Sequence, residues 1–182
     1  MKSRENKVFQ LVMAALFAAL ICVGTMLIRI PVPATGGYVN LGDGILLLGA
    51  FLMNPVYAAM AAGIGSMLAD VLAGYMQYAV ATLIIKSAMA YCGAFLFRKL
   101  MAKMQNKKML LPMLLSGVVA EIYMVIGYFV FEALLLGYGL GAAAAIMGNV
   151  GQGVMGVVIA CVAGPLLLRN AEVRNLLNRI WK

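Results

Sequence analysis

The feature that most limits how this chain can fold is a series of long apolar segments separated by short polar turns. Six such segments can be delimited, at residues 8–28, 41–53, 56–73, 78–97, 110–131 and 140–168. About 20 consecutive apolar residues cross the hydrocarbon core of a bilayer as a helix. The second segment is short, and the sixth is long enough to tilt or break. We therefore predict an all-α membrane protein, a compact bundle of six transmembrane helices.

The composition supports this class. Hydrophobic residues make up 65% of the chain and charged residues 11%, with a mean hydropathy of +1.00. A soluble domain averages about 45–50% apolar and about 25% charged residues, so a soluble core of this size would not hide so much apolar surface. No polar linker or low-complexity tract divides the chain, which predicts one six-helix membrane domain over residues 1–182.

The basic residues predict the orientation. With a cytoplasmic N-terminus and six crossings, twelve of the 14 basic residues fall on the cytoplasmic side, while Arg29 falls outside and Lys86 lies within a segment. This is the asymmetry that the positive-inside rule describes, so we predict two cytoplasmic termini. The net charge of +8 would suggest nucleic acid in a soluble protein, but its placement indicates membrane orientation and no nucleic-acid partner.

Both ends of the chain carry further expectations. Residues 1–7 are predicted to form a short cytoplasmic N-terminus. Residues 169–182 are predicted to include a helix on the inner membrane surface, because Val173, Leu176, Leu177 and Ile180 recur at helical spacing and Trp181 suits headgroup depth. A merely solvated tail is the alternative.

The sequence disfavours catalysis. The chain has no His, which is the commonest general base and metal ligand. Cys22, Cys92 and Cys161 each fall inside an apolar segment without a C-x-x-C pair, as expected for packed or lipid-facing thiols. We predict no catalytic residues, no metal ligands and no enzyme activity.

Polar residues within the apolar segments are the candidates for function. Under the predicted orientation they lie in the outer half of the bilayer or near its midplane: Asp43 at the outer end of its segment, Asp70, Lys86, Glu121, Asn149 and Gln152, with Glu132 at the outer edge of its segment. A charge at the bilayer centre costs at least about 2.5–3.5 kcal/mol, so it is a functional candidate by default. Structural pairs, Lys86 with Glu121 or Asp70, are the alternative. We expect these groups, with Asn40, to form an outward-facing polar pocket.

Aromatic and small residues add two expectations. Tyr38, Tyr75 and Tyr78 lie in or beside the outer loops, where tyrosines either anchor the interface or cover a flat solute ring. Ala14 with Ala18, and Ala15 with Ala19, form small-x-x-x-small pairs on the first segment. Such pairs let helices meet closely, either within the bundle or with another membrane subunit.

Residues 36–86, GGYVNLGDGILLLGAFLMNPVYAAMAAGIGSMLADVLAGYMQYAVATLIIK, resemble the substrate-capturing S components of energy-coupling factor (ECF) vitamin transporters. The resemblance implies a prokaryotic plasma-membrane protein that binds a vitamin or precursor on its outer side, with residues 29–40 as a lid. It implies that Ala14, Ala15, Ala18 and Ala19 contact the membrane-embedded T subunit. It also implies two cytoplasmic ATPase subunits that use ATP, so this chain needs no cofactor. The pattern is most similar to the pyridoxine- or hydroxymethylpyrimidine-type branch, although riboflavin-type relatives share it.

These observations lead to one set of predicted substrate contacts: Tyr38, Asn40, Asp43, Asp70, Tyr75, Tyr78, Lys86, Glu121, Asn149 and Gln152. Two other functions stay open. In a self-contained, ion-coupled secondary carrier, Lys86 and Glu121 would relay protons. A purely structural membrane subunit would bind no small molecule.

Overall fold

The computed structural model describes residues 2–104, 109–173 and 175, with side chains described from Asn6 onward. Five long helices dominate it: α1 (Lys2–Leu27), α3 (Pro55–Ala73), α4 (Met76–Lys103), α5 (Leu110–Val130) and α6 (Ala143–Arg169). Each belongs to a helical segment long and apolar enough to cross a membrane. A shorter apolar helix, α2 (Gly42–Leu52), completes the set. The predicted all-α membrane bundle is confirmed.

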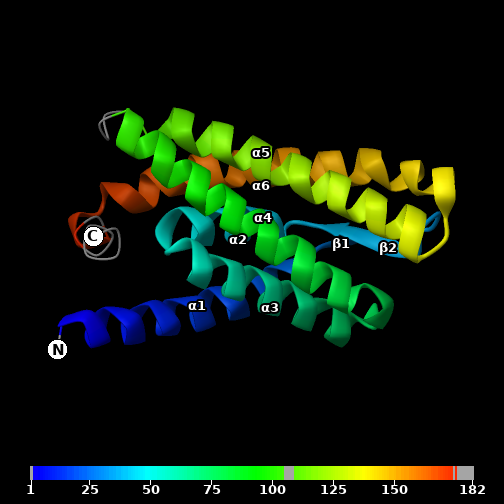
Figure 1. Cartoon of the computed structure of the whole chain (residues 1–182), viewed down its shortest axis with the longest axis horizontal. Helices are drawn as coiled ribbons and strands as arrows, with labels where there is room; N and C mark the ends of the chain where they lie inside the picture. Colours follow the sequence, from blue (N-terminus) through cyan, green and yellow to red (C-terminus); the bar gives the residue numbers. More distant parts are fainter. Residues whose placement is uncertain (1, 105–108, 174, 176–182) are drawn as a thin grey trace.

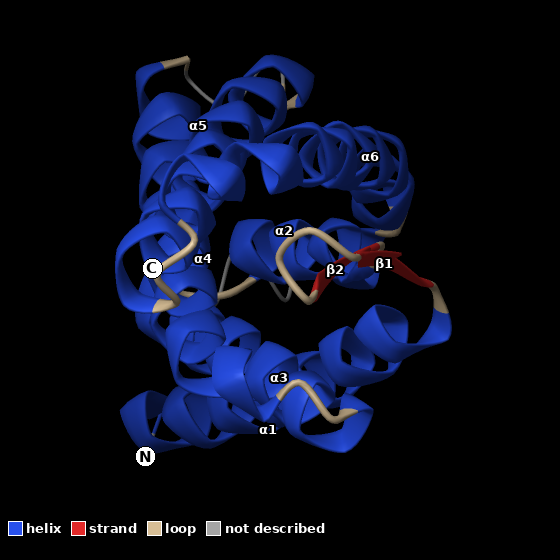
Figure 2. Cartoon of the chain, turned by 90° about the vertical axis from the view of Figure 1, so that its right-hand side faces the viewer, coloured by secondary structure: helices blue, strands red, loops and turns tan. Residues whose placement is uncertain are grey.

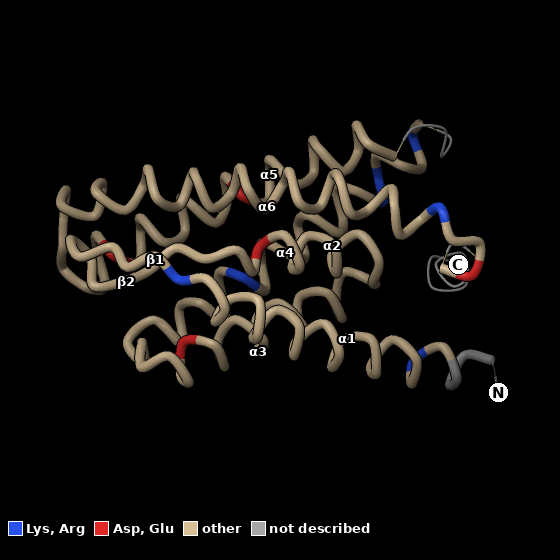
Figure 3. The backbone as a smooth tube through the Cα atoms, turned by 180° about the vertical axis from the view of Figure 1, so that it is seen from behind, with Lys and Arg blue, Asp and Glu red and all other residues tan. Residues whose placement is uncertain are grey.

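The helices run back and forth along one long axis. Figure 1 shows that α1 begins and α6 ends at the same end of the bundle. Figure 3 shows basic residues gathered at this end and others farther along the bundle. We call it the basic end. Which side of the membrane it faces stays a prediction from the positive-inside rule.

The predicted termini differ from the observed helices in extent. Because α1 begins at Lys2, the short N-terminal segment is largely a continuation of the first helix. At the other terminus, α6 reaches Arg169 and residues 171–173 are again helical. Most of the predicted interfacial helix at 169–182, including Trp181, lies outside the described residues.

The short helix α2 lies at the centre of the bundle. Figure 2 shows it surrounded by the long helices, and it packs against α1, α3, α4 and α6. Nine of its 11 residues are buried, as expected for a helix that is apolar all round. At about 1.5 Å per residue it covers only about half of a hydrocarbon core of about 30 Å. The chain therefore has to enter the bundle before α2 begins.

That entry is made by a β-hairpin, which the sequence analysis did not predict. Strands β1 (Arg29–Val32) and β2 (Gly37–Asn40) pair antiparallel, with Arg29 opposite Asn40 and Val32 opposite Gly37. Four-residue strands are too short for a clear alternation, and Pro31 disfavours strand assignment. A two-stranded sheet has only edge strands, however, so proline is tolerated there. The hairpin descends beside α6 and delivers Gly42 to mid-bundle (Figures 1 and 2).

The apolar core surrounds α2 toward the basic end. Leu46, Leu47 and Phe51 of α2 are almost completely buried, and the Phe51 ring lies 4.7 Å from that of Phe97 on α4. Most of the buried charged side chains, among them Asp43, Asp70, Lys86 and Glu132, lie on the other side of α2, around its N-terminus and the hairpin. Gln10 and Ser116 are buried separately, toward the basic end.

Small residues bring α1 and α3 close together. A Cβ on Gly65 of α3 would lie 2.4 Å from the main-chain oxygen of Ala18. Ala14 is buried, whereas Ala15 and Ala19 are exposed, and all four alanines line a groove beside α3. Ala14 and Ala18 therefore take part in internal packing, while Ala15 and Ala19 remain on the outer surface.

Candidate functional site

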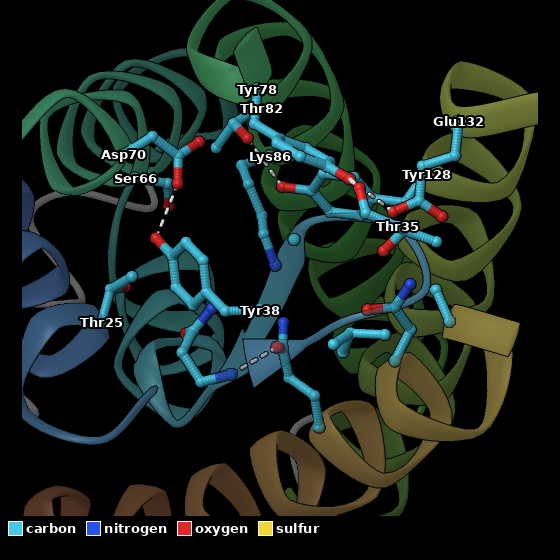
Figure 4. Close-up of a pocket in the computed structure, with 16 residues that line it drawn as sticks. Thr25, Thr35, Tyr38, Ser66, Asp70, Tyr78, Thr82, Lys86, Tyr128 and Glu132 are labelled. Atoms are coloured by element: carbon cyan, nitrogen blue, oxygen red, sulfur yellow. Dashed lines mark hydrogen bonds between the residues drawn. The ribbon is translucent and has the colours of Figure 1, made fainter. Parts of the chain in front are cut away.

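A polar pocket lies between the hairpin and the long helices, and Figure 4 shows the side chains that line it. Sixteen residues line it. They come from α1, the hairpin, α3, α4, α5, the π-helical segment Phe131–Leu135 that follows α5, and α6. The free space it encloses is about 30 Å³. Pockets that hold small molecules usually measure roughly 300–1,000 Å³. The pocket is therefore nearly closed in this conformation.

A buried ion pair forms the floor of the site. Lys86 Nζ of α4 donates to Asp43 Oδ1 of α2 at 2.5 Å, and both side chains are almost fully buried. Gln152 Nε2 of α6 donates to the other oxygen, Asp43 Oδ2, at 2.6 Å. Both carboxylate oxygens of Asp43 are thus satisfied, as a buried charge requires.

The same network fixes the end of the hairpin. The main-chain N–H of Asn40 donates to Gln152 Oε1 at 2.7 Å, and the Asn40 side chain accepts from the N–H of Gly42 at 2.8 Å. Since Gln152 also bonds Asp43, it joins β2, α2 and α6. Lys86 Nζ lies 5.6 Å from the centre of the Tyr128 ring, so the ammonium also faces an aromatic surface.

Asp43 lies at the start of its helix, as predicted, but the helix itself begins deep in the bundle. The partner of Asp43, Lys86, is the eleventh residue of α4. Ten residues of helix correspond to roughly 15 Å, which puts the ion pair near the middle of the bundle. The physical reason is that the hairpin carries the chain inward before α2 starts.

The tip and second strand of the hairpin are held by two tyrosines. The Tyr38 hydroxyl donates to Asp70 Oδ1 of α3 at 2.6 Å, and its ring lies 4.5 Å from the ring of Tyr75. Burial raises the pKa of the Tyr38 hydroxyl, and the neighbouring Asp70 carboxylate raises it further, so Tyr38 remains a donor.

The second tyrosine, Tyr78 of α4, lies between the hairpin and α5. Its hydroxyl oxygen lies 2.8 Å from the Thr35 carbonyl oxygen and 3.0 Å from Glu132 Oε1, and its single proton serves these two acceptors. Gly37 allows this approach, because a Cβ there would lie 2.9 Å from the Tyr78 hydroxyl. Hydrogen bonds from α3, α4 and α6 therefore close the hairpin over the pocket.

Seven of the ten predicted contact residues line this pocket: Tyr38, Asn40, Asp70, Tyr78, Lys86, Asn149 and Gln152. Of the other three, Asp43 lies beneath the pocket, bonded to Lys86 and Gln152. Tyr75 packs against the Tyr38 ring instead of lining the pocket. The sequence pattern thus identified most of one spatial cluster.

Glu121, the remaining predicted residue, does not line the polar pocket. Its carboxylate packs against the glycine surface of α6, where a Cβ on Gly156 would lie 2.7 Å from Glu121 Oε1 and 3.0 Å from Asp43 Cβ. The residue also borders a separate, apolar groove between α5 and α6. Neither of its oxygens has a hydrogen-bond partner among the described residues.

Several lining residues were missed. The polar or aromatic ones are Thr25, Thr35, Ser66, Thr82 and Tyr128. Glu132, which the sequence analysis expected near the pocket without naming it as a substrate contact, also lines it. Helical spacing would have indicated two of the missed residues: Thr82 lies one turn before Lys86, and Tyr128 lies one turn before Glu132. Thr35 depends on the hairpin, which the sequence did not reveal.

Comparison with known proteins identifies the family of the chain. The sequence model of the ECF-type riboflavin transporter S component family matches residues 5–171. The chain is 31% identical over 171 residues to the "Thiamine precursor transporter HmpT" of Lactococcus lactis subsp. cremoris (strain MG1363), covering 93% of this chain and 94% of that protein. It is 38% identical over 147 residues to a Pyrococcus woesei protein described as "Uncharacterized protein in gap 3′ region", covering 81% of this chain and 93% of that protein. The family and the transporter relative mark a non-enzymatic transport protein of the membrane, and the chain belongs to the ECF-type riboflavin transporter S component family.

Proposed function

We propose that this chain is the solute-binding and translocating subunit of an ECF-type importer for a small vitamin precursor with a pyridoxine- or hydroxymethylpyrimidine-like ring. The observation that carries the proposal is the convergence of seven predicted polar and aromatic side chains on one pocket beneath the hairpin. Membership of the S component family and the similarity to a thiamine precursor transporter support it.

The chemistry of the pocket suits such a solute. Tyr38, Tyr78 and Tyr128 offer ring surfaces, and Asp70, Asn149 and Lys86 offer polar groups at different heights. Polar groups that are buried around a cognate ligand give selectivity, because a wrong ligand leaves them unpaired. The same set would bind a purely apolar solute poorly.

In this proposal the hairpin is the element that moves when a solute binds. With about 30 Å³ of free space, the pocket admits a vitamin-sized ring only after the hairpin or its neighbours shift. The tyrosine bonds to Asp70 and Thr35 hold the hairpin in place, and they lie on the side of the hairpin that faces α3 and α4. In this proposal residues 29–40 act as a lid.

The partners follow from the same proposal. The chain contains no G-x-x-x-x-G-K-[ST] sequence, so ATP would be used by two separate cytoplasmic ATPase subunits. A membrane-embedded T subunit would dock on α1, where Ala15 and Ala19 are exposed beside α3. Small residues at this position let a partner helix approach closely.

The test has two parts. Mass spectrometry of the purified protein should identify a co-purifying ring compound, and that compound should rebind to the stripped protein. Reconstituted vesicles should then accumulate it only when T and ATPase subunits and ATP are present. Uptake by this chain alone, driven by a pH gradient, would instead establish the secondary carrier. The absence of any bound small molecule would point to a structural subunit.

A further inference from the structure

Two buried carboxylates that line the pocket each keep one oxygen atom without a hydrogen bond of ordinary geometry among the described residues. Asp70 is 4% exposed and Glu132 is 3% exposed. Asp70 uses Oδ1 to accept from Tyr38, and Glu132 uses Oε1 to accept from Tyr78. Asp70 Oδ2 and Glu132 Oε2 have no hydrogen-bond partner among the described residues. Buried acceptors of this kind are rare in native proteins, so each requires an explanation.

Neighbouring hydroxyls do not remove the excess of acceptors. Thr35 Oγ1 lines the same pocket beside the Glu132 carboxylate, although it makes no hydrogen bond of ordinary geometry among the described residues. Thr82 Oγ1 lies beside the Asp70 carboxylate and 3.0 Å from the Tyr128 hydroxyl. A hydroxyl carries one proton, whereas an ionised carboxylate offers about four acceptor positions. Even if both threonines turned toward the carboxylates, acceptor positions would outnumber donors.

The positive charge in the pocket is already engaged. Lys86 lines the pocket, but its ammonium is paired with Asp43 at 2.5 Å. Figure 4 shows Asp70 and Glu132 on opposite sides of the pocket, with the Lys86 side chain between them. The pocket therefore presents two separated acceptor groups, the carboxylates of Asp70 and Glu132. Between them lies Lys86, whose positive charge is neutralised by Asp43.

We propose that the solute is a heteroaromatic amine without a phosphate group, and that Asp70 and Glu132 determine this specificity. The solute presents N–H donors, or a protonated amine, at two separated positions. One of these donors bonds Asp70 Oδ2 and the other bonds Glu132 Oε2. A phosphate ester is rejected, because it would bring negative charge beside two carboxylates while the lysine is paired elsewhere. The inference rests on the proposed function and narrows its solute class.

The experiment compares matched solutes on the full-length protein in detergent, by isothermal titration calorimetry. One pair is an amino-substituted hydroxymethylpyrimidine and its counterpart without the amino group. The other is pyridoxamine and pyridoxine, with pyridoxamine phosphate as the charged comparison, because it differs from pyridoxamine in the phosphate alone. A hydrogen bond to a charged group changes affinity by roughly tenfold or more. We expect the amine of at least one pair to bind at least about tenfold more tightly than its counterpart, and the phosphate ester not to bind.

Variants then locate the preference. Glu132→Gln and Asp70→Asn each replace a carboxylate oxygen by an amide nitrogen, and each should reduce the amine-to-counterpart affinity ratio. Glu172→Gln makes the same exchange at an exposed site after α6 and should leave the ratio unchanged. Thermal melts check that the variants fold. The amine preference itself is tested on the unsubstituted protein, so that test does not depend on the variants.

The outcomes separate the two proposals. Equal affinity within both pairs, or tighter binding of the phosphate ester, would overturn the amine inference while leaving a solute-binding subunit. An amine preference that survives both carboxylate substitutions would overturn the assignment to Asp70 and Glu132. If none of these ring compounds binds, the proposed solute class and this inference fall together.

Discussion

Lys86 and Asp43, 43 residues apart in the sequence, meet at 2.5 Å in the middle of the bundle, and neither side chain reaches solvent or the exposed helix surface. The pair joins the central half-helix α2 to α4, and Gln152 extends it to α6. Three elements that surround the pocket are therefore coupled through one carboxylate. This arrangement makes the Lys86–Asp43 pair the first target for mutagenesis.

Lys86→Met should destabilise the protein strongly, because it leaves the Asp43 charge buried without its counter-ion. Removing one partner of a buried pair costs about 3–5 kcal/mol. The double variant Lys86→Met with Asp43→Asn removes both charges and should recover at least half of that loss. Chemical unfolding in detergent measures the free energies. Strictly additive losses would show that the two groups are not coupled.

Gly156→Ala should disturb the packing of α6 against α2 and α5. The added Cβ would lie 2.7 Å from Glu121 Oε1 and 3.0 Å from Asp43 Cβ. Overpacking of this kind typically costs about 1–3 kcal/mol. Gly151→Ala is the matched control on the same helix, since no described atom outside the neighbouring turns of α6 lies within 4 Å of its Cβ position. Thermal unfolding of the two variants should differ clearly, and equal stabilities would contradict the observed closeness of Glu121 to α6.

Tyr38→Phe should speed the release of bound solute. The substitution keeps the ring against Tyr75 but removes the hydroxyl that donates to Asp70 at 2.6 Å. Because this bond helps hold the hairpin over the pocket, we expect a dissociation rate about tenfold faster, the effect of a lost charge-assisted bond. Stopped-flow displacement measures the rate.

The control for this experiment is Tyr123→Phe, which removes a hydroxyl from an exposed tyrosine on the outer face of α5. Its dissociation rate should match that of the unsubstituted protein. An unchanged rate in Tyr38→Phe would mean that the hairpin is not held by this bond during release.

Ala15→Leu combined with Ala19→Leu should abolish uptake while leaving solute affinity unchanged. Both alanines are exposed on α1 and line the outer groove beside α3 instead of the pocket, so the larger side chains alter the proposed docking surface. Uptake with T and ATPase subunits, measured beside calorimetric binding, tests this. Ala144→Leu, an exposed alanine at the start of α6, serves as the control. Normal uptake by the double variant would rule out docking at this surface.

The sequence was informative about helices because their signal is local. The observed α3 (Pro55–Ala73) and α6 (Ala143–Arg169) lie within a few residues of the segments predicted at 56–73 and 140–168. In lipid every backbone polar group must be satisfied within its own segment, so apolar length alone almost dictates a helix. Polar groups inside such segments are costly, which is why Asp70, Lys86 and Gln152 stand out as candidates in the sequence alone.

The sequence by itself determined the membrane class, the positions of the helices and most of the polar residues that line the pocket. The tertiary structure decided which of those residues meet: Lys86 pairs with Asp43 instead of Glu121 or Asp70, and Glu121 turns toward the glycines of α6. It also decided that a hairpin carries α2 into the centre of the bundle. Hydropathy is a local property of each segment, so it can be read from the sequence. The pairing of side chains depends on how the helices rotate and approach one another. That packing is set by contacts between residues far apart in the sequence, which no local pattern encodes.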